Sequence, residues 1–302
     1  MRTVGIIGAG VVGTAVGVIL SSKGYEITGV YDIDPESTKL LCERTAAKIC
    51  TTPGEVSRSA EILFVTTSDS AIGDVAKEIA LEGGFFNNQL VIHMSGALTS
   101  EVLLPARESG SLTVSIHPMQ SFANADRAIS NLPGSIFSIE GDQEAHEMSA
   151  QLVKDLDGDS FVIDKKAKPL YHAGACVVSN YLVTLIDMGL QLLESIGIPR
   201  QQALPAMLPL INGTIRNVEK IGIPEALTGP IARGDLSTVL KHLDCIQEMA
   251  PDLIKLYSWL GYYTAEVAAA KGTVDRAGAD EFKKLFLREM SGVTASAVRR
   301  GE

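Results

Sequence analysis

Two residues that could take part in proton-transfer chemistry lie directly after predicted strands. His117 follows the apolar run 112–116 and precedes Pro118, which disfavours the helical conformation at residue 117 and holds it extended. Imidazole titrates near neutral pH, so His117 could act as a general acid or base, or simply bond a loop carbonyl. Ser95 follows the run 90–93, in which His93 is expected to be a core residue. Ser95 could hydrogen-bond a substrate or serve as a turn serine.

A polar stripe marks the helical pattern that begins near residue 168. Its members recur at intervals of three or four residues and are Lys168, His172, Cys176 and Ser179, with Asn180 beside them. Such a stripe on an apolar helix faces a substrate cleft or another helix, and its three kinds of hydrogen-bonding group favour the cleft. We therefore expect His172 and Asn180 to act with His117 and Ser95 in catalysis. Lys168 and Ser179 are expected to bind substrate.

A loop with two glycines and a proline, residues 228–235, offers a further anion-binding group. Its Arg233 could bind a substrate carboxylate through two parallel hydrogen bonds. Asp235 directly precedes the helical pattern at 236–243, which predicts that it is the N-cap of that helix.

The stretch GIIGAGVVG, residues 5–13, has the spacing G-x-G-x-x-G between a predicted strand and a predicted helix. In this pattern the first glycine allows a tight turn, the second lets a pyrophosphate approach the backbone, and the third lets the helix pack closely on the strand. The amino end of the helix then attracts phosphate. The pattern predicts a dinucleotide site with the contact residues Gly8, Ala9, Gly10, Val11, Val12 and Gly13.

Asp32 lies at the end of the second predicted strand, 19 residues after Gly13. A carboxylate there accepts hydrogen bonds from ribose hydroxyls and repels a 2′-phosphate, so NAD is favoured over NADP. Alternatively, Asp32 belongs to a turn before the next helix. Thr66, Thr67 and Ser68 follow the third strand and are candidate cofactor contacts, although Ser68 or Asp69 could instead cap a helix.

These residues require a mostly parallel sheet with helices on both faces, followed by an all-helical region. We predict a Rossmann-type α/β domain over residues 1–165 and a helical substrate and dimerisation domain over 166–302. Prolines 199, 205, 224, 230 and 251 are expected between helices or at their starts. The predicted strands are 3–7, 26–31, 62–66, 90–93, 112–116, 135–139 and 160–163. The predicted helices of the second half are 168–196, 200–221, 235–248, 251–271 and 278–289.

Composition excludes several classes of function. The net charge of −10 provides no basic surface for a nucleic acid. The four cysteines show no C-x-x-C spacing, so no metal site is predicted. The apolar run 173–198 carries polar or charged residues that include Ser179, Asn180, Thr184, Asp187, Gln191 and Glu194, which favours a buried core helix over a membrane span. With no secretory signal in the first residues, we expect a cytoplasmic protein.

Together, GIIGAGVVG, HMSGAL, SIHPMQSF, YHAGACVVSNYLVTL and TGPIARGD resemble a bacterial family of Rossmann-like oxidoreductases. Its members carry a C-terminal domain of unknown function of the 6-phosphogluconate dehydrogenase C-terminal type. Distant resemblances extend to prephenate dehydrogenase, whose substrate-bonding histidine maps onto His117, to the β-hydroxyacid dehydrogenases and to pyrroline-5-carboxylate reductase. These resemblances imply an NAD(P) cofactor and a homodimer formed through the helical domain.

The leading hypothesis is an NAD(P)-dependent dehydrogenase or reductase acting on a small, carboxylate-bearing hydroxy, oxo or imino compound. Two alternatives stay open. One is a dinucleotide-binding regulator without turnover, and the other is an imine reductase of the pyrroline-5-carboxylate reductase type.

Overall fold

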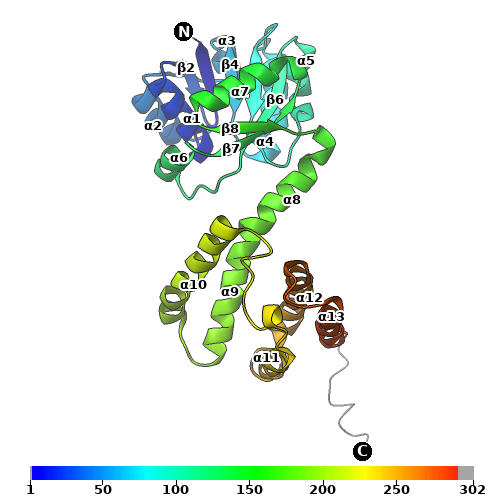
Figure 1. Ribbon diagram of the computed structural model, residues 1–302. Helices are drawn as coiled ribbons and strands as arrows, with labels where there is room; N and C mark the ends of the chain where they lie inside the picture. Colours follow the sequence, from blue (N-terminus) through cyan, green and yellow to red (C-terminus); the bar gives the residue numbers. More distant parts are fainter. Residues whose placement is uncertain (1, 292–302) are drawn as a thin grey trace, which may run out of the picture. The chain divides into compact units, whose positions relative to one another are not determined.

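A computed structural model of the protein describes residues 2–291. The chain divides into two compact units, the first ending at Asn180 and the second beginning at Tyr181 (Figure 1). The division falls beyond the boundary predicted near residue 165, because the helix after the last strand packs on the first unit.

The first unit is built on one eight-stranded sheet in the order β3-β2-β1-β4-β5-β6-β7-β8. Neighbouring strands are parallel except for β6 and β7, which are antiparallel, so β7 and β8 run opposite to the other strands. The strands are β1 (Thr3–Ile7), β2 (Glu26–Tyr31), β3 (Lys48–Ile49), β4 (Ile62–Val65), β5 (Leu90–His93), β6 (Leu112–Pro118), β7 (Ile136–Gly141) and β8 (Asp159–Val162). The predicted mostly parallel sheet is confirmed. The strand that the sequence did not reveal, β3, has only two residues, both exposed, and so carries no hydrophobic pattern.

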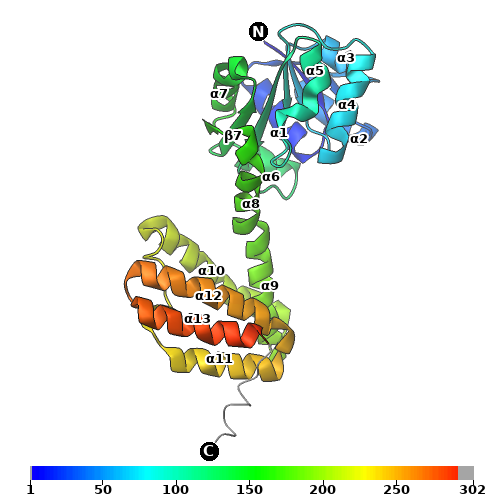
Figure 2. The same ribbon diagram turned by 90° about the vertical axis from the view of Figure 1, so that its right-hand side faces the viewer.

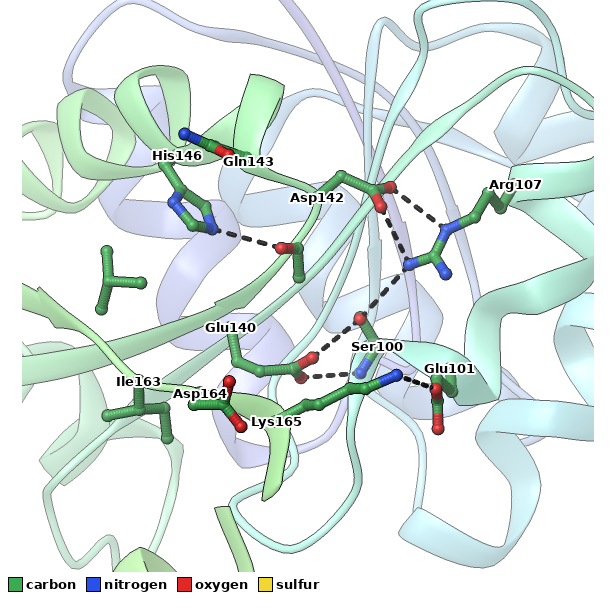
Figure 3. A pocket seen from close by; sticks show the side chains of 12 residues that line it. Ser100, Glu101, Arg107, Glu140, Asp142, Gln143, His146, Ile163, Asp164 and Lys165 are labelled. Atoms are coloured by element: carbon green, nitrogen blue, oxygen red, sulfur yellow. Dashed lines mark hydrogen bonds and ion pairs between the residues drawn. The ribbon is translucent and has the colours of Figure 1, made fainter. Parts of the chain in front are cut away.

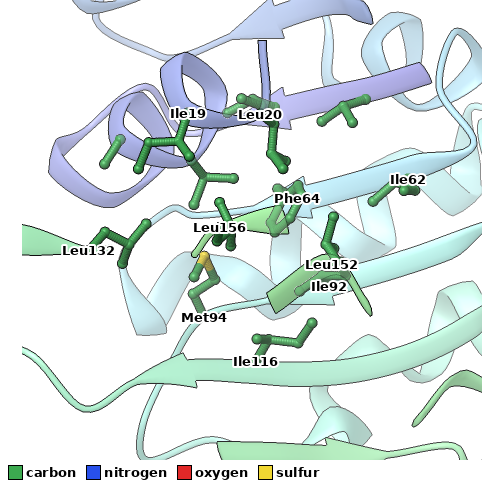
Figure 4. Close-up of a cluster of buried hydrophobic side chains, with 14 of the residues drawn as sticks. Ile19, Leu20, Ile62, Phe64, Ile92, Met94, Ile116, Leu132, Leu152 and Leu156 are labelled. Atoms are coloured by element: carbon green, nitrogen blue, oxygen red, sulfur yellow. The ribbon is translucent and has the colours of Figure 1, made fainter. Parts of the chain in front are cut away.

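Helices cover both faces of this sheet, as the alternating pattern predicted. One face packs against α1 (Val11–Ser22), α2 (Pro35–Thr45), α6 (Ala125–Asn131) and α7 (His146–Asp155). Figure 4 shows this core, in which Ile19 and Leu20 of α1 lie near Phe64 of β4. The other face packs against α3 (Pro53–Arg58), α4 (Asp69–Leu81), the 3-10 turn η1 (Ser100–Leu103) and α5 (Leu104–Glu108).

That second face becomes polar toward β6 and β7. His93, Ser115 and Glu140 are register partners on β5, β6 and β7, and all three side chains are buried. The 3-10 turn η3 (Lys165–Ala167) and helix α8 (Lys168–Val178) follow β8 and lead back over this polar region. As a result α8 brings Lys168, Tyr171 and His172 to residues of β6.

The second unit is helical, as predicted. Its helices are α9 (Asn180–Ser195, from Tyr181 onward), α10 (Arg200–Ile221), α11 (Leu236–Met249), α12 (Ile254–Lys271) and α13 (Arg276–Met290), with the short turns η4 (Ile231–Arg233) and η5 (Pro251–Leu253). Its core lies among α11, α12 and α13, which run side by side in Figure 2. Gly261 of α12 lets Phe286 of α13 pack closely, since a Cβ on Gly261 would lie 2.3 Å from the Phe286 ring.

Three expectations about the helices were wrong. The predicted helix 168–196 is interrupted at Ser179, which separates α8 from α9. Pro205 lies inside α10 together with Pro209, and both are exposed, so water can bond the carbonyls that these prolines leave free.

The third error concerns the run 173–198, expected as a buried core helix. The stretch Lys165–Ser195 is long and apolar enough to cross a membrane, and only 11% of its most apolar window is buried within one copy of the chain. Length and composition alone make this weak evidence for a membrane span. Most of this stretch is therefore exposed in a single copy of the chain.

Candidate functional site

The glycine loop between β1 and α1 has the geometry that its spacing predicted. Gly8 has a φ of +99°, a conformation that other residues rarely adopt. A Cβ on Gly13 would lie 2.0 Å from the Gly8 carbonyl oxygen, so only glycine lets α1 approach the strand this closely. A Cβ on Gly10 would meet nothing within 4 Å, which leaves open space in front of the loop. A pyrophosphate would fit in that space.

Asp32 closes this site at the end of β2. The backbone N–H of Ala9 donates to the Asp32 carboxylate over 2.7 Å, and the N–H of Asp34 donates over 2.8 Å. The turn reading of Asp32 is therefore confirmed, because its carboxylate anchors the turn before α2, while its contact with a ribose stays a prediction. A cavity of about 300 Å³ extends from the loop past Asp32. Its wall includes the apolar side chains of Ile33, Ala71 and Val75, which suit an adenine ring.

The three residues that follow β4, namely Thr66, Thr67 and Ser68, also line this cavity. Thr66 donates its hydroxyl to the Gly8 carbonyl over 2.7 Å, so it stabilises the loop from behind. The Thr67 hydroxyl is buried beside the cavity without a hydrogen-bond partner among the described residues. Ser68 is the N-cap residue of α4 but forms no capping hydrogen bond through its side chain. The open space at Gly10 and the unpartnered Thr67 hydroxyl fit a bound dinucleotide.

Ser95 and His93, after and within β5, have structural roles. The Ser95 hydroxyl donates to Asp69 of α4 over 2.8 Å and accepts the N–H groups of Ala97 and Leu98. Ser95 is thus the turn serine, and its hydroxyl is already engaged, so the expected catalytic contact is not supported. His93 is fully buried and bonds the Thr99 carbonyl, as expected of a core residue. Burial and the nearby Lys168 charge lower the pKa of His93 to about 3.

His117 lies near the end of β6, at the edge where β1, β4 and β5 also end, and contacts two residues of α8. Its Nδ1 forms a 2.8 Å hydrogen bond with the Tyr171 hydroxyl. Its ring also meets His172 edge to face, with 6.0 Å between ring centroids. Burial, followed by the charges of Lys168 and His172, lowers the pKa of His117 to about 4. The imidazole is therefore neutral at physiological pH.

Tyr171 was missed by the sequence reading. It lies three residues after Lys168, so helical spacing places both on one face of α8, and this signal could have identified it. Tyr171 packs edge to face on Phe161 of β8 as well as on His117.

His172 and Gly96 form the other side of this group. A Cβ on Gly96 would lie 2.5 Å from Nδ1 of His172 and 2.7 Å from Nε2 of His117, so glycine is required for both rings to approach. Nδ1 of His172 is buried without a hydrogen-bond partner among the described residues, and its Nε2 lies 3.5 Å from the Cys176 sulfur. The structure therefore brings together His117, Tyr171 and His172, and we name this group the histidine cluster.

Lys168 lies beneath the histidine cluster. Its side chain is fully buried, and its ammonium donates to the Ser115 hydroxyl. Burial lowers the pKa of Lys168 to about 8, although the carboxylates of Glu140 and Asp69 act in the opposite direction. Such burial argues against the expected direct contact with substrate, and the charge acts on the cluster through space instead.

The remaining predicted residues lie elsewhere on the helices. Ser179 and Asn180 are exposed at the break between α8 and α9. Arg233 is exposed at the end of η4 in the second unit. Their substrate contacts stay predictions. Asp235 is confirmed as the N-cap of α11, since its carboxylate accepts the N–H of Thr238 over 3.0 Å.

A larger cavity of about 600 Å³ lies at the carboxyl ends of β7 and β8 (Figure 3). Its charged side chains pair with each other or with the backbone: Arg107 with Asp142, Lys165 with Glu101, and Glu140 with the hydroxyl and N–H of Ser100. These charged side chains of the cavity are therefore already paired within the protein. Within residues 2–291, no group of three or more His, Cys, Asp or Glu side chains is arranged to hold a metal ion.

Comparisons with known proteins agree with this architecture. A Rossmann-like domain model matches residues 1–118, and the model of a domain of unknown function, DUF2520, matches residues 135–264. No curated protein matches the sequence.

Solved structures with a similar fold cover most of this chain. A Bacteroides fragilis protein described as a candidate NADP oxidoreductase is 25% identical, with a TM-score of 0.69 over 88% of this chain and 98% of its own. A Thermotoga maritima protein is 24% identical, with a TM-score of 0.71 over 89% and 99%. Pyrroline carboxylate reductase from Plasmodium falciparum, with NADP bound, is 16% identical, with a TM-score of 0.58 over 94% and 98%.

The first model covers β1 to β6 of the sheet. The second covers β7, β8 and the helices from α7 to most of α12, so the two follow each other in the order that the motifs predicted. The chain therefore contains a region that matches the Rossmann-like domain model, followed by a region that matches the DUF2520 model, which is the combination that its sequence motifs resemble.

Proposed function

We propose that this protein is an oxidoreductase that uses a nicotinamide dinucleotide to transfer a hydride to or from a small hydroxy, oxo or imino compound. The observation that carries this proposal is the placement of the glycine loop and the histidine cluster at one edge of one sheet. Strands β1, β4, β5 and β6 are neighbours, so the loop after β1 and His117 near the end of β6 are separated by three strand spacings, about 14 Å. A dinucleotide bound at the loop could extend along this edge toward the cluster.

Each residue of the site has a proposed role that follows from its position. The glycine loop binds the pyrophosphate, and Asp32 binds the adenosine ribose. The bound nicotinamide supplies the hydride chemistry. His117 donates a hydrogen bond to the reacting oxygen or nitrogen of the substrate, and His172 packs beside it.

Asp32 supports a preference for NAD. Its carboxylate faces the loop and would repel a 2′-phosphate. The similar proteins described above include NADP-associated ones, so the preference of this chain is tested directly by comparing dissociation constants for NADH and NADPH.

The first test of the proposal is whether the protein binds NADH, which is measured by the fluorescence of NADH. NADH oxidation is then measured with a panel of 2-oxo acids and cyclic imines, which separates carbonyl from imine reduction. Binding without turnover of any panel member would favour the regulator alternative.

Changing His117 to alanine provides the sharper test. We expect His117→Ala to lower turnover by about two orders of magnitude or more, with NADH affinity nearly unchanged, because the side chain lies away from the glycine loop. His146→Ala, which removes an imidazole from α7 instead, is the matched control and should retain turnover. Unaltered turnover in His117→Ala would refute the role given to this residue.

A further inference from the structure

The hydrogen bond between His117 and Tyr171 bears on which ring nitrogen of His117 carries the proton. A neutral imidazole carries one proton, on Nδ1 or on Nε2, and the partner of one nitrogen decides where that proton lies. In this protein the partner of Nδ1 is the Tyr171 hydroxyl, 2.8 Å away.

The direction of this hydrogen bond follows from the two groups. His117 is neutral at physiological pH, because its pKa is lowered to about 4 by burial and by the nearby charges of Lys168 and His172. Burial raises the pKa of Tyr171, with the neighbouring Ser138 hydroxyl acting the other way, so the phenol keeps its proton. Two neutral groups could bond in either direction. A phenol is the stronger donor and an imidazole nitrogen the stronger acceptor, so the favoured arrangement has the phenol donating and Nδ1 accepting.

We propose that Tyr171 is a positioning residue that holds His117 as the neutral tautomer protonated on Nε2, so that His117 meets the substrate as an uncharged hydrogen-bond donor. This inference deepens the proposed function and rests on it for its catalytic consequence, although the tautomer itself does not depend on any activity.

The surroundings of His117 favour a neutral ring and place its Nε2 on the side away from Tyr171. Nε2 is the nitrogen that faces Gly96, away from Tyr171, where a Cβ would lie only 2.7 Å from it. His117 is the register partner of Ser138 on β7, so the strand pairing places the Ser138 hydroxyl near Tyr171. Lys168, buried below and bonded to Ser115, disfavours a second proton on the ring.

The second unit contains a matched pair for comparison. His242 Nδ1 and the Tyr257 hydroxyl are also 2.8 Å apart, and their rings also meet edge to face. This pair lies on α11 and α12, outside the histidine cluster. Tyr257→Phe removes the same kind of hydrogen bond without touching His117.

The experiment is two-dimensional ¹H–¹⁵N NMR of protein labelled with ¹⁵N-histidine, recorded from pH 5.5 to pH 8. The chain has only five histidines, and the His117 signals are assigned from their loss in His117→Gln. In the wild type we expect an unprotonated Nδ1 and a protonated Nε2 for His117, unchanged across this pH range.

In Tyr171→Phe we expect the His117 signals to shift toward a mixture of the two neutral tautomers, whereas Tyr257→Phe should move only the His242 signals. Turnover in Tyr171→Phe should fall at least tenfold, with NADH affinity unchanged. A His117 ring protonated on Nδ1, or titrating near pH 6.5, would overturn the inference, as would unchanged His117 signals in Tyr171→Phe.

The two proposals fail separately. If the tautomer is as expected but no panel substrate reacts, the positioning role of Tyr171 stands and the proposed function does not. If His117→Ala abolishes turnover but the tautomer differs, the proposed function stands and the role of Tyr171 does not.

Discussion

Lys168 brings a positive charge into the interior of the first unit, where it has no exposed surface. Its pKa is lowered to about 8 from the ordinary value of 10.5, with burial as the main cause. Between pH 8 and 10.5 the unfolded chain therefore keeps a proton on Lys168 that the folded chain has lost, so the contribution of Lys168 to stability rises with pH in this window and is constant below it. At pH 7 the buried charge costs about 3 kcal/mol relative to an exposed lysine.

Replacing Lys168 with methionine tests whether the buried charge costs more stability than its hydrogen bond to Ser115 contributes. We expect Lys168→Met to raise the free energy of unfolding at pH 7 by about 1–3 kcal/mol, because an apolar chain of similar volume avoids the buried charge. The difference in stability between the variant and the wild type should shrink as the pH rises above 8, because the wild type then loses its buried charge. Urea denaturation at pH 7, 8, 9 and 10 measures both effects. A less stable variant at pH 7 would show that the bond to Ser115 outweighs the cost of burial.

The loop between β1 and α1 shows how one element uses glycine for two different reasons. At Gly13 the constraint comes from the fold, since a Cβ would lie 2.0 Å from the Gly8 carbonyl oxygen. At Gly10 a Cβ would meet nothing within 4 Å, so the fold itself does not require glycine there, and we expect the requirement to come from a bound pyrophosphate. The two positions separate folding from cofactor binding.

Alanine at each position should therefore behave differently. We expect Gly10→Ala to change the free energy of unfolding by about 1 kcal/mol or less while weakening NADH binding at least tenfold. Gly13→Ala should lose about 1–3 kcal/mol of stability as well, because the helix must move away from the strand. Thermal or urea unfolding and NADH fluorescence distinguish the two variants. Equal NADH affinity in Gly10→Ala and the wild type would contradict the proposed pyrophosphate position.

The apolar surface of the second unit bears on the assembly of the whole molecule. Large apolar side chains on α9 and α10 are well exposed within one copy, among them Val183 at 68% and Leu210 at 69%. Exposed apolar residues gathered on neighbouring elements mark an interaction surface. We propose that a second copy of the chain covers these helices, as the resemblance to dimeric dehydrogenases implies.

This homodimer is tested by light scattering, with an expected mass of twice 32.1 kDa. Glutamate at both Val183 and Leu210 should produce a monomer that retains its helical circular dichroism. Leu81→Glu, on the exposed end of α4, is the control and should stay dimeric. A wild-type monomer, or binding to lipid vesicles in place of self-association, would refute the proposed interface.

Local sequence was sufficient to predict the geometry of the glycine loop and most of the elements. The glycine spacing, the strand before it and Asp32 act within one βαβ unit, where neighbours in sequence are neighbours in space. For the same reason Asp235 was correctly predicted as a helix cap, and the core position of His93 followed from its strand. The break at Ser179 and the prolines within α10 were missed, because helical periodicity continues across both.

Only the tertiary structure decided which polar groups of the histidine cluster meet. Tyr171, Gly96 and His117 come from three separate elements, and no local pattern encodes the packing of α8 on β6. That packing buried Lys168, which spacing alone had assigned to substrate. It also directed the Tyr171 hydroxyl to His117, while the turn after β5 turned the Ser95 hydroxyl toward Asp69. The physical reason is that a side chain's chemistry depends on its burial and its partners, and both are set by contacts between residues far apart in the chain.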